Sequence, residues 1–314
     1  MQLEIIRYDN RYKEAWDTFV KASKNGTFLF EREYMDYHKE RFFDCSLMIY
    51  SNGDLLALFP ATLHADNETV VSHAGLTYGG LITDRRATAE VVLEIFSAII
   101  EYCKTVADAE KIIYKPVPHI YHSYPGEEDL YALFRNNARL TERKISSAIK
   151  LSDAIPFKGR RKLTTAMKNR LQIIEDSNFA AFWEILSDRL KSKYSVSPVH
   201  TLEEIELLHS RFPNNIRLFR VIDESSSTLG GVVMYIMGNV AHSQYISTTD
   251  EGRRIGVLDH LHEYLITKRF ADMEYFDFGT SVEDGGRYLN SGLIAHKERL
   301  GGRAVMYDTY EILI

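Results

Sequence analysis

The sequence predicts an α/β (α+β) fold of two tandem domains, each a mixed, mostly antiparallel sheet flanked by helices. Three observations support it: the length of 314 residues, the alternation of helical and strand-like patterns, and the recurrence of one element order in both halves. A chain of this length exceeds one domain of ordinary size. Hydrophobic residues make up 45% and charged residues 26%, a balance typical of globular proteins.

Helical periodicity in the first half predicts a helix pair over residues 11–23 and 33–42. Strand-like runs follow over 45–76, where Asn52-Gly53 and Asp66-Asn67 are hairpin signals. The remaining elements expected in this half are a helix over 89–104, a strand over 111–115, a helix over 127–138 and a strand over 143–151.

The second half repeats this order. It predicts helices over 178–191 and 201–212, three strands within 216–247, a helix over 256–270, a strand over 274–279, a helix over 290–302 and a last strand over 303–314. The two halves share almost no residue identity, so the alternative that α/β chains in general look self-similar stays open. "SDAIPFKGRR" (152–161) interrupts the pattern with Pro156 and Gly159, which predicts domains of residues 1–155 and 156–314.

The net charge and the cysteines exclude some classes of function and indicate a cellular compartment. The net charge is −6, with 38 basic against 44 acidic residues, which argues against DNA binding or broad adhesion to anionic lipid. Cys45 and Cys103 match no metal spacing and fit a reducing cytoplasm. No transmembrane segment is expected, because no apolar run approaches the ~18 residues that a bilayer span needs. The N-terminus lacks the pattern of a secretory signal, and we expect a cytoplasmic protein.

Two basic stretches are candidates for phosphate binding. "KGRRKLTTAMKNR" (158–170) is expected to form an amphipathic helix whose basic face either holds phosphate or is merely solvated. "TDEGRRIGVLDHL" (249–261) places Gly252, Arg253, Arg254 and Gly256 between a strand and a helix. A helix N-terminus preceded by glycine favours pyrophosphate, although an ordinary turn explains the stretch equally well.

Other polar residues have less specific patterns. Asp277 lies inside the strand run "YFDFGTS" (275–281), where a buried aspartate needs a partner. His260 and His262 would project about 200° apart on a helix and therefore cannot share one metal ion, so no metal site is predicted. "VSHAGLTYGGLI" (71–82) fits either close backbone packing or a substrate-lining loop.

Five segments carry a family resemblance: "TFLFEREYMDYHK" (27–39), "GLTYGGLI" (75–82), "RRKLTTAMKNRLQI" (160–173), "YFDFGTS" (275–281) and "LNSGLIAHKERLGG" (289–302). In these segments the chain resembles the Fem family of peptidyltransferases (FemABX-like) and GNAT-like acyltransferases with tandem GNAT domains. His296 and Leu300 stand where the family pattern has phenylalanine, and the long helical arm associated with tRNA handling is absent.

The resemblance implies an N-acyltransferase that moves an acyl or aminoacyl group to an amine of a cell-envelope or polysaccharide precursor. The donor would be acyl-CoA, as a co-substrate, or aminoacyl-tRNA, with no tightly bound cofactor. The first domain would support the acceptor, and the second would bind the donor and catalyse. A transient contact with a membrane-bound precursor would fit this role. The sequence leaves the oligomeric state open.

The resemblance implies three groups of site residues: catalytic, donor-binding and acceptor-binding. The catalytic residues would be Lys297, as the oxyanion stabiliser, with Asp277 and His296. The general base stays open between Asp277, His296, His242 and an amine that arrives deprotonated. Donor-binding residues would be Arg253, Arg254 and Gly256. Acceptor-binding residues, in a cleft between the domains, would be Lys39, Tyr78, Arg160, Arg161 and Tyr245. The alternative function is a non-catalytic binding module of GNAT fold that recognises a glycolipid or peptide precursor.

Overall fold

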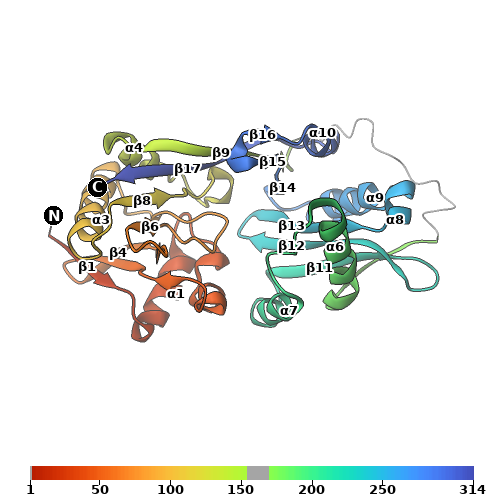
Figure 1. The fold of residues 1–314 in the computed structure, drawn as a ribbon, viewed down its shortest axis with the longest axis horizontal. Helices are drawn as coiled ribbons and strands as arrows, with labels where there is room; N and C mark the ends of the chain where they lie inside the picture. The colour runs from red at the N-terminus through yellow and green to blue at the C-terminus, as the bar shows by residue number, and fades with distance from the viewer. Residues whose placement is uncertain (1, 154–169) are drawn as a thin grey trace. The chain divides into compact units, whose positions relative to one another are not determined.

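A computed structural model describes residues 2–153 and 170–314, which form two compact units (Figure 1). Unit 1 comprises residues 1–145, 282–289 and 305–314, and unit 2 comprises residues 146–281 and 290–304. The predicted boundary between residues 155 and 156 and the predicted basic helix over 158–170 lie outside the described residues or at their edge. The last strand was predicted within the second domain, whereas most of its residues belong to unit 1 by their contacts.

Unit 1 has the expected mixture of short strands and helices. Its strands are β1 (Leu3–Arg7), β2 (Phe43–Asp44), β3 (Leu47–Ser51), β4 (Asp54–Phe59), β5 (Thr62–Leu63), β6 (Thr69–Val71), β7 (Ile82–Thr83), β8 (Lys111–Tyr114), β15 (Val282–Glu283), β16 (Tyr288–Leu289) and most of β17 (Arg303–Leu313). Its helices are α1 (Lys13–Ala22), α2 (Arg32–Met35), α3 (Ala89–Thr105) and α4 (Glu128–Arg135).

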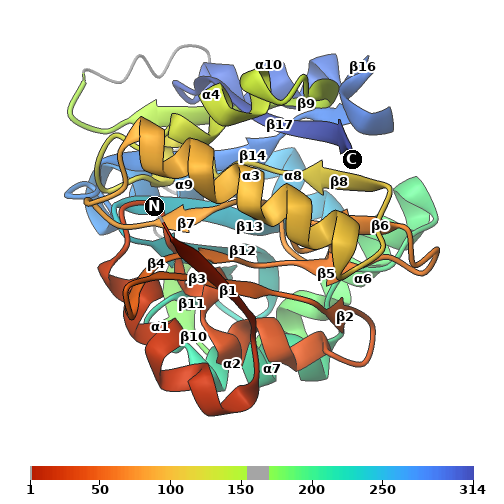
Figure 2. The same cartoon turned by 90° about the vertical axis from the view of Figure 1, so that its left-hand side faces the viewer.

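Antiparallel pairing dominates the sheets of unit 1. One sheet has the order β1-β3-β4-β7. In the other, β17-β8-β6-β5-β2, only β6 and β8 run parallel. Figure 2 shows α3 lying across the strands of this unit, where Ile95, Phe96 and Ile99 pack into the main core cluster.

The predicted helix over 33–42 is wrong in its second half. The α-helix ends at Met35, and a 3-10 turn over Asp36–His38 follows. The reason is the contact with Asp44: besides Asp36, four residues on, the buried guanidinium of Arg32 bonds Asp44, twelve residues on. This requires the chain to turn back so that Asp44 can pair with Thr62 in the sheet.

Unit 2 carries one sheet with the order β10-β11-β12-β13-β14-β9. The strands are β9 (Arg139–Lys150), which begins in unit 1, β10 (Gln172–Asp176), β11 (Ile216–Ile222), β12 (Thr228–Met237), β13 (Val240–Thr248) and β14 (Tyr275–Thr280). The helices are α6 (Phe179–Tyr194), α7 (Leu202–Arg211), α8 (Asp250–Ile255), α9 (Val257–Tyr264), which continues as a short π-helix over Leu265–Arg269, and α10 (Ser291–Arg299).

Helices cover both faces of the unit 2 sheet. Side chains alternate between the faces of a strand, and in β12 Val232 and Met234 join the cluster that contains Leu261 of α9. On the other face, a Cβ placed on Gly231 would lie 2.9 Å from the Phe182 ring of α6. The glycine therefore lets α6 approach the strand closely.

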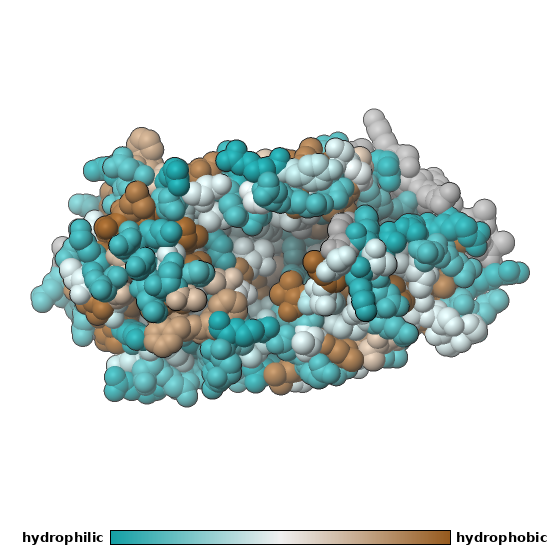
Figure 3. Space-filling model, viewed as in Figure 1, coloured by the Kyte–Doolittle hydropathy of each residue, from teal (hydrophilic) through white to brown (hydrophobic). Residues whose placement is uncertain are grey.

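Neither unit presents a membrane-spanning element in the described part of the chain, where every helix is too short or too polar to cross a bilayer. On the face drawn in Figure 3, hydrophilic residues predominate and hydrophobic ones occur in small groups.

The α7 N-terminus offers a test of local stability in unit 2. Thr201 Oγ1 accepts a hydrogen bond from the Glu204 N–H (3.2 Å), and the Thr201 N–H donates to Glu204 Oε2 (2.9 Å). Replacing such a cap by alanine costs about 1 kcal/mol. We therefore expect Thr201→Ala to lower the unfolding free energy of unit 2 by about 1 kcal/mol, and Thr201→Ser to leave it nearly unchanged.

The two tryptophans make this measurable unit by unit, because Trp16 lies in unit 1 and Trp183 in unit 2. In a Trp16→Phe background, tryptophan fluorescence during urea unfolding reports unit 2 alone. An equal urea midpoint for Thr201→Ala and its parent would contradict the capping role.

Candidate active site

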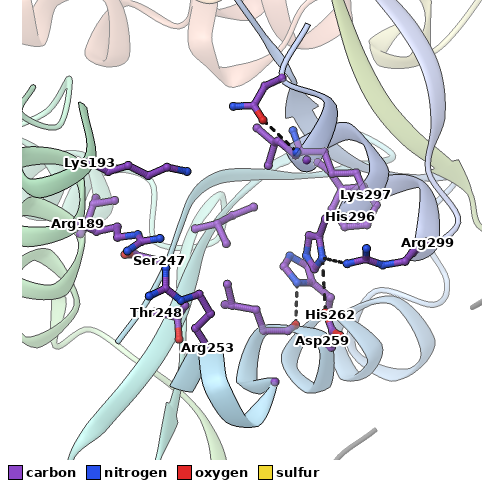
Figure 4. Close-up of a pocket in the computed structure, with 18 of the residues that line it drawn as sticks. Arg189, Lys193, Ser247, Thr248, Arg253, Asp259, His262, His296, Lys297 and Arg299 are labelled. Carbon is purple, nitrogen blue, oxygen red and sulfur yellow. Dashed lines mark hydrogen bonds and ion pairs between the residues drawn. The ribbon is translucent and has the colours of Figure 1, made fainter. Parts of the chain in front are cut away.

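A cavity of about 800 Å³ opens in unit 2 where two neighbouring strands part. β13 and β14 pair in parallel over only three positions, from Val240 with Tyr275 to His242 with Asp277. Beyond them the far end of β13, at Ile246, Ser247 and Thr248, and Phe278 of β14 line the cavity. Residues of α6, α8, α9 and α10 complete its wall (Figure 4).

The point of parting is held by the carboxylate of Asp277, which is fully buried. Oδ1 accepts hydrogen bonds from Ser146 Oγ of β9 (2.7 Å) and from the Gly279 N–H (3.0 Å), and Oδ2 lies 2.8 Å from His242 Nδ1 of β13. A buried carboxylate requires such partners. Asp277 thereby joins β9, β13 and β14 at the base of the cavity, and it does not line the cavity itself.

Lys297 lies in the cavity wall with its side chain 3% exposed. Its Nζ donates to the carbonyl oxygens of Gly279 (2.8 Å) and Thr280 (2.7 Å). Gly279 has a positive φ of 75°, a conformation that glycine adopts without strain. Burial lowers the pKa of Lys297 to about 8, and the charge of Asp277 partly offsets that fall. An ammonium has three donors, so one remains beyond these two carbonyls.

Two histidines adjoin Lys297 in the wall. His296 Nδ1 lies 3.7 Å from Asp259 Oδ1 and 3.2 Å from Arg299 Nη2, and burial lowers its pKa. His262 is buried behind it, with Nδ1 2.8 Å from the Leu258 carbonyl oxygen, and burial lowers its pKa to about 3. His262 is therefore neutral at physiological pH, and its Nδ1 donates to that carbonyl.

The opposite side of the cavity is basic. In Figure 4, Arg189 and Lys193 of α6 and Arg253 of α8 lie across from the histidines. Asp259 is the carboxylate among the described lining residues, and His296 lies beside it. The cationic lining residues, in chain order, are Arg189, Lys193, Arg253, Lys297 and Arg299. The cavity is thus strongly cationic in a chain whose net charge is −6.

The structure brings four of the predicted residues to this one cavity: Lys297, His296, Arg253 and Gly256. Gly256, with a φ of 88°, ends α8 and begins α9. Arg254 projects outside the lining and pairs with Glu251 at 3.7 Å.

The predicted acceptor residues do not line it. Tyr245 is buried, with its hydroxyl 2.5 Å from His200 Nδ1 and its ring against Trp183. Tyr78 is buried in unit 1 among the rings of Phe30, Tyr121 and Tyr307. Lys39 is exposed in unit 1, and Arg160 and Arg161 lie outside the described residues. Their roles stay predictions.

Sequence reasoning missed Arg189, Lys193, Asp259 and His262 as cavity residues. Arg189 and Lys193 stand four apart on α6, beside the lining residues Leu186 and Leu190. Such spacing places side chains on one helix face, and basic residues on an otherwise apolar face are the signal that was available. For residues 2–153 and 170–314, no group of three or more His, Cys, Asp or Glu side chains has a geometry able to hold a metal ion.

A comparison with known protein families finds a match over the residues that form much of this cavity. Residues 158–288 match the acetyltransferase (GNAT) domain model. That stretch of the chain is similar to a GNAT domain. This match confirms the predicted acyltransferase class, and the matched residues supply much of the cavity wall. No curated protein matches the chain.

Solved structures extend the GNAT likeness to the whole chain at the level of fold. FemX is 12% identical with a TM-score of 0.69, over 99% of this chain and 97% of that chain. A tandem GNAT protein from the clavulanic acid biosynthesis pathway is 10% identical with a TM-score of 0.55, over 99% and 98%. L-PGS from Bacillus licheniformis is 12% identical with a TM-score of 0.58, over 96% and 91%. The predicted tandem GNAT fold with Fem-like relatives is confirmed.

The lowered pKa of Lys297 predicts a pH dependence of stability. The lysine releases its proton near pH 8 in folded unit 2 but only near pH 10.4 when unfolded. Between these values the unfolded state binds more protons, so the unfolding free energy rises with pH. We expect this rise in unit 2 and its loss in Lys297→Met.

Urea unfolding from pH 7 to pH 10.5, followed by Trp183 fluorescence in the Trp16→Phe background, measures the difference between the two proteins. Lys115 of unit 1, whose pKa burial also lowers to about 8, does not enter this readout. Parallel curves for the two proteins would show that burial does not disfavour the charged Lys297.

Proposed function

We propose that the protein is an N-acyltransferase whose reaction takes place in the cavity between β13 and β14. An amine nitrogen attacks the carbonyl carbon of an acyl or aminoacyl donor, so that an N–C bond forms and a C–S or C–O bond breaks. The donor is a CoA thioester or an aminoacyl ester of tRNA, and the acceptor is an amine of a cell-envelope or polysaccharide precursor.

The observation that carries this proposal is the setting of Lys297. Its ammonium is buried in the cavity wall and fixed by the carbonyls of Gly279 and Thr280. A fixed donor that needs no reorganisation stabilises negative charge as it develops on the carbonyl oxygen. Because Lys297 loses its proton near pH 8, this support weakens as the pH rises through that value.

His296 is the proposed proton acceptor. It lies next to Lys297 in the cavity wall, and its lowered pKa favours the neutral imidazole at pH 7. Asp277 and His242 bond each other at 2.8 Å and lie outside the lining, so we assign them to positioning. The proton that leaves the amine passes to His296, and the leaving thiolate or ribose oxygen is protonated in turn.

The acceptor class rests on relatives. One neighbour, the C-terminal domain of a putative lysylphosphatidylglycerol synthetase from Agrobacterium fabrum, has a TM-score of 0.56 at 11% identity. Its name, that of a putative synthetase of the lipid lysylphosphatidylglycerol, supports a lipid-linked precursor as acceptor here. The cytoplasmic location expected from the composition stays a prediction.

The test is transfer to amines of envelope precursors from radiolabelled acyl-CoA and aminoacyl-tRNA donors, followed by kinetics with the pair that turns over. We expect Lys297→Met to lower kcat on the order of 100–1000-fold with little change in KM. The matched control is Lys268→Met, since Lys268 is exposed and outside the cavity lining. Turnover of Lys297→Met within threefold of wild type would refute the assignment.

A further inference from the structure

The Nδ1 atom of His296 lies between a guanidinium and a carboxylate. Arg299 Nη2, one turn further along α10, is 3.2 Å away, and Asp259 Oδ1 of α9 is 3.7 Å away. Figure 4 draws both contacts as dashed lines. The first distance is that of a hydrogen bond, whereas the second is too long for one. Arg299 therefore holds the bond to Nδ1, and Asp259 lies close enough to replace it after a small movement.

This bond fixes the protonation of the neutral ring. A guanidinium can only donate, so Nδ1 must accept and the ring proton is on Nε2. A carboxylate only accepts, so a bond to Asp259 requires the proton on Nδ1 and leaves the lone pair on Nε2. Arg299 and Asp259 thus favour opposite tautomers of His296. Burial lowers the pKa of His296, which keeps the ring neutral near pH 7.

Nε2 of His296 is the nitrogen that a substrate can reach. Within residues 2–153 and 170–314 it makes no hydrogen bond, and 30% of the His296 side chain is exposed. The ring lines the cavity next to Lys297. A proton released by a substrate in this cavity can be accepted only while Nε2 has its lone pair, in the tautomer that Asp259 favours.

We propose that Asp259 and Arg299 are positioning residues whose competition for Nδ1 sets the fraction of His296 able to accept a proton at Nε2. The tautomer bonded to Arg299 is the resting one, and the tautomer bonded to Asp259 is the active one. In the active form the amine proton moves to Nε2 as the N–C bond forms and the C–S or C–O bond breaks, and the Asp259 carboxylate stabilises the imidazolium. This deepens the proposed function and rests on it for the role of His296.

The direct test is the ring ¹⁵N spectrum, at pH 7.5, of the full chain labelled in its 11 histidines, because protonated and bare imidazole nitrogens resonate far apart. The His296 signals are those lost in His296→Gln. We expect the proton on Nε2 in the wild type and on Nδ1 in Arg299→Met, since methionine donates no hydrogen bond. Adding Asp259→Asn to Arg299→Met should return part of the proton to Nε2, because a neutral amide accepts a weaker hydrogen bond than a carboxylate.

Matched controls lie in unit 2 outside the cavity lining. Arg269 pairs with Glu175 at 3.4 Å, and Asp272 is exposed. Arg269→Met and Asp272→Asn change the net charge as the test variants do, and we expect neither to move the His296 signals. A wild-type proton on Nδ1, an unchanged tautomer in Arg299→Met, or an equal change in Arg269→Met overturns the proposal.

Turnover of the donor–acceptor pair that reacts gives a second readout. We expect Arg299→Met to raise kcat about two- to fivefold and Asp259→Asn to lower it about 5–20-fold. Asp259→Glu keeps the charge and should recover most of this loss. Equal kcat values in Asp259→Asn and Asp272→Asn would remove Asp259 from the reaction. The ¹⁵N spectrum needs no turnover, and His296→Gln tests the proton acceptor by rate, so the tautomer control and the proposed function fail independently.

Discussion

The buried carboxylate of Asp277 is the contact on which the rest of the site depends. It accepts hydrogen bonds from β9 and from the Gly279 N–H and pairs with His242 of β13. His242 and Asp277 are also the last paired positions of β13 and β14, so the cavity starts where this network ends. Because Asp277 holds the Gly279 amide, it also directs the carbonyls that fix Lys297. The buried carboxylate of Asp277 therefore connects the sheet to Lys297 in the cavity wall.

Unit 1 also has one pair of parallel strands, but a loop fills the gap beyond them. Its parallel pair, β6 and β8, is followed by a loop that folds back on the strands: the Gly79 N–H donates to the Lys115 carbonyl, and the Lys115 N–H donates to Ser72 Oγ. Lys115 Nζ then bonds the carbonyls of His73 and Leu76. A lysine fixed by two carbonyls occurs in both units, but in unit 1 the carbonyls belong to the loop that fills the gap. This explains the glycines of "GLTYGGLI": a Cβ on Gly79 would lie 1.8 Å from the Ser72 carbonyl oxygen.

Periodicity was enough to predict most helices and the order of the strands, since α3, α6, α7 and α10 each match an expected range closely. It failed over 33–42, where the Arg32 contact with Asp44 overrides local helix preference. The candidate site was likewise predicted only in part. Lys297 and Asp277 could be named from the family pattern. The partners of Asp277 lie in β9 and β13, far away in the chain, and these contacts could not be predicted from local patterns. Arg189 and Lys193 could have been noticed as basic residues on an otherwise apolar helix face, but only the folded chain shows that this face lines a cavity.

The electrostatics of the cavity favour an uncharged nucleophile. Burial lowers the pKa values of Lys297, His262 and His296, so this end of the cavity disfavours positive charge. An amine bound beside these groups experiences the same desolvation, and the cationic lining adds repulsion, so its own pKa falls as well. Only the neutral amine has the lone pair that attacks a carbonyl. In the proposed reaction, the cationic lining and the burial that fixes Lys297 therefore act in the same direction, and the role proposed for His296 is to accept the proton released after attack.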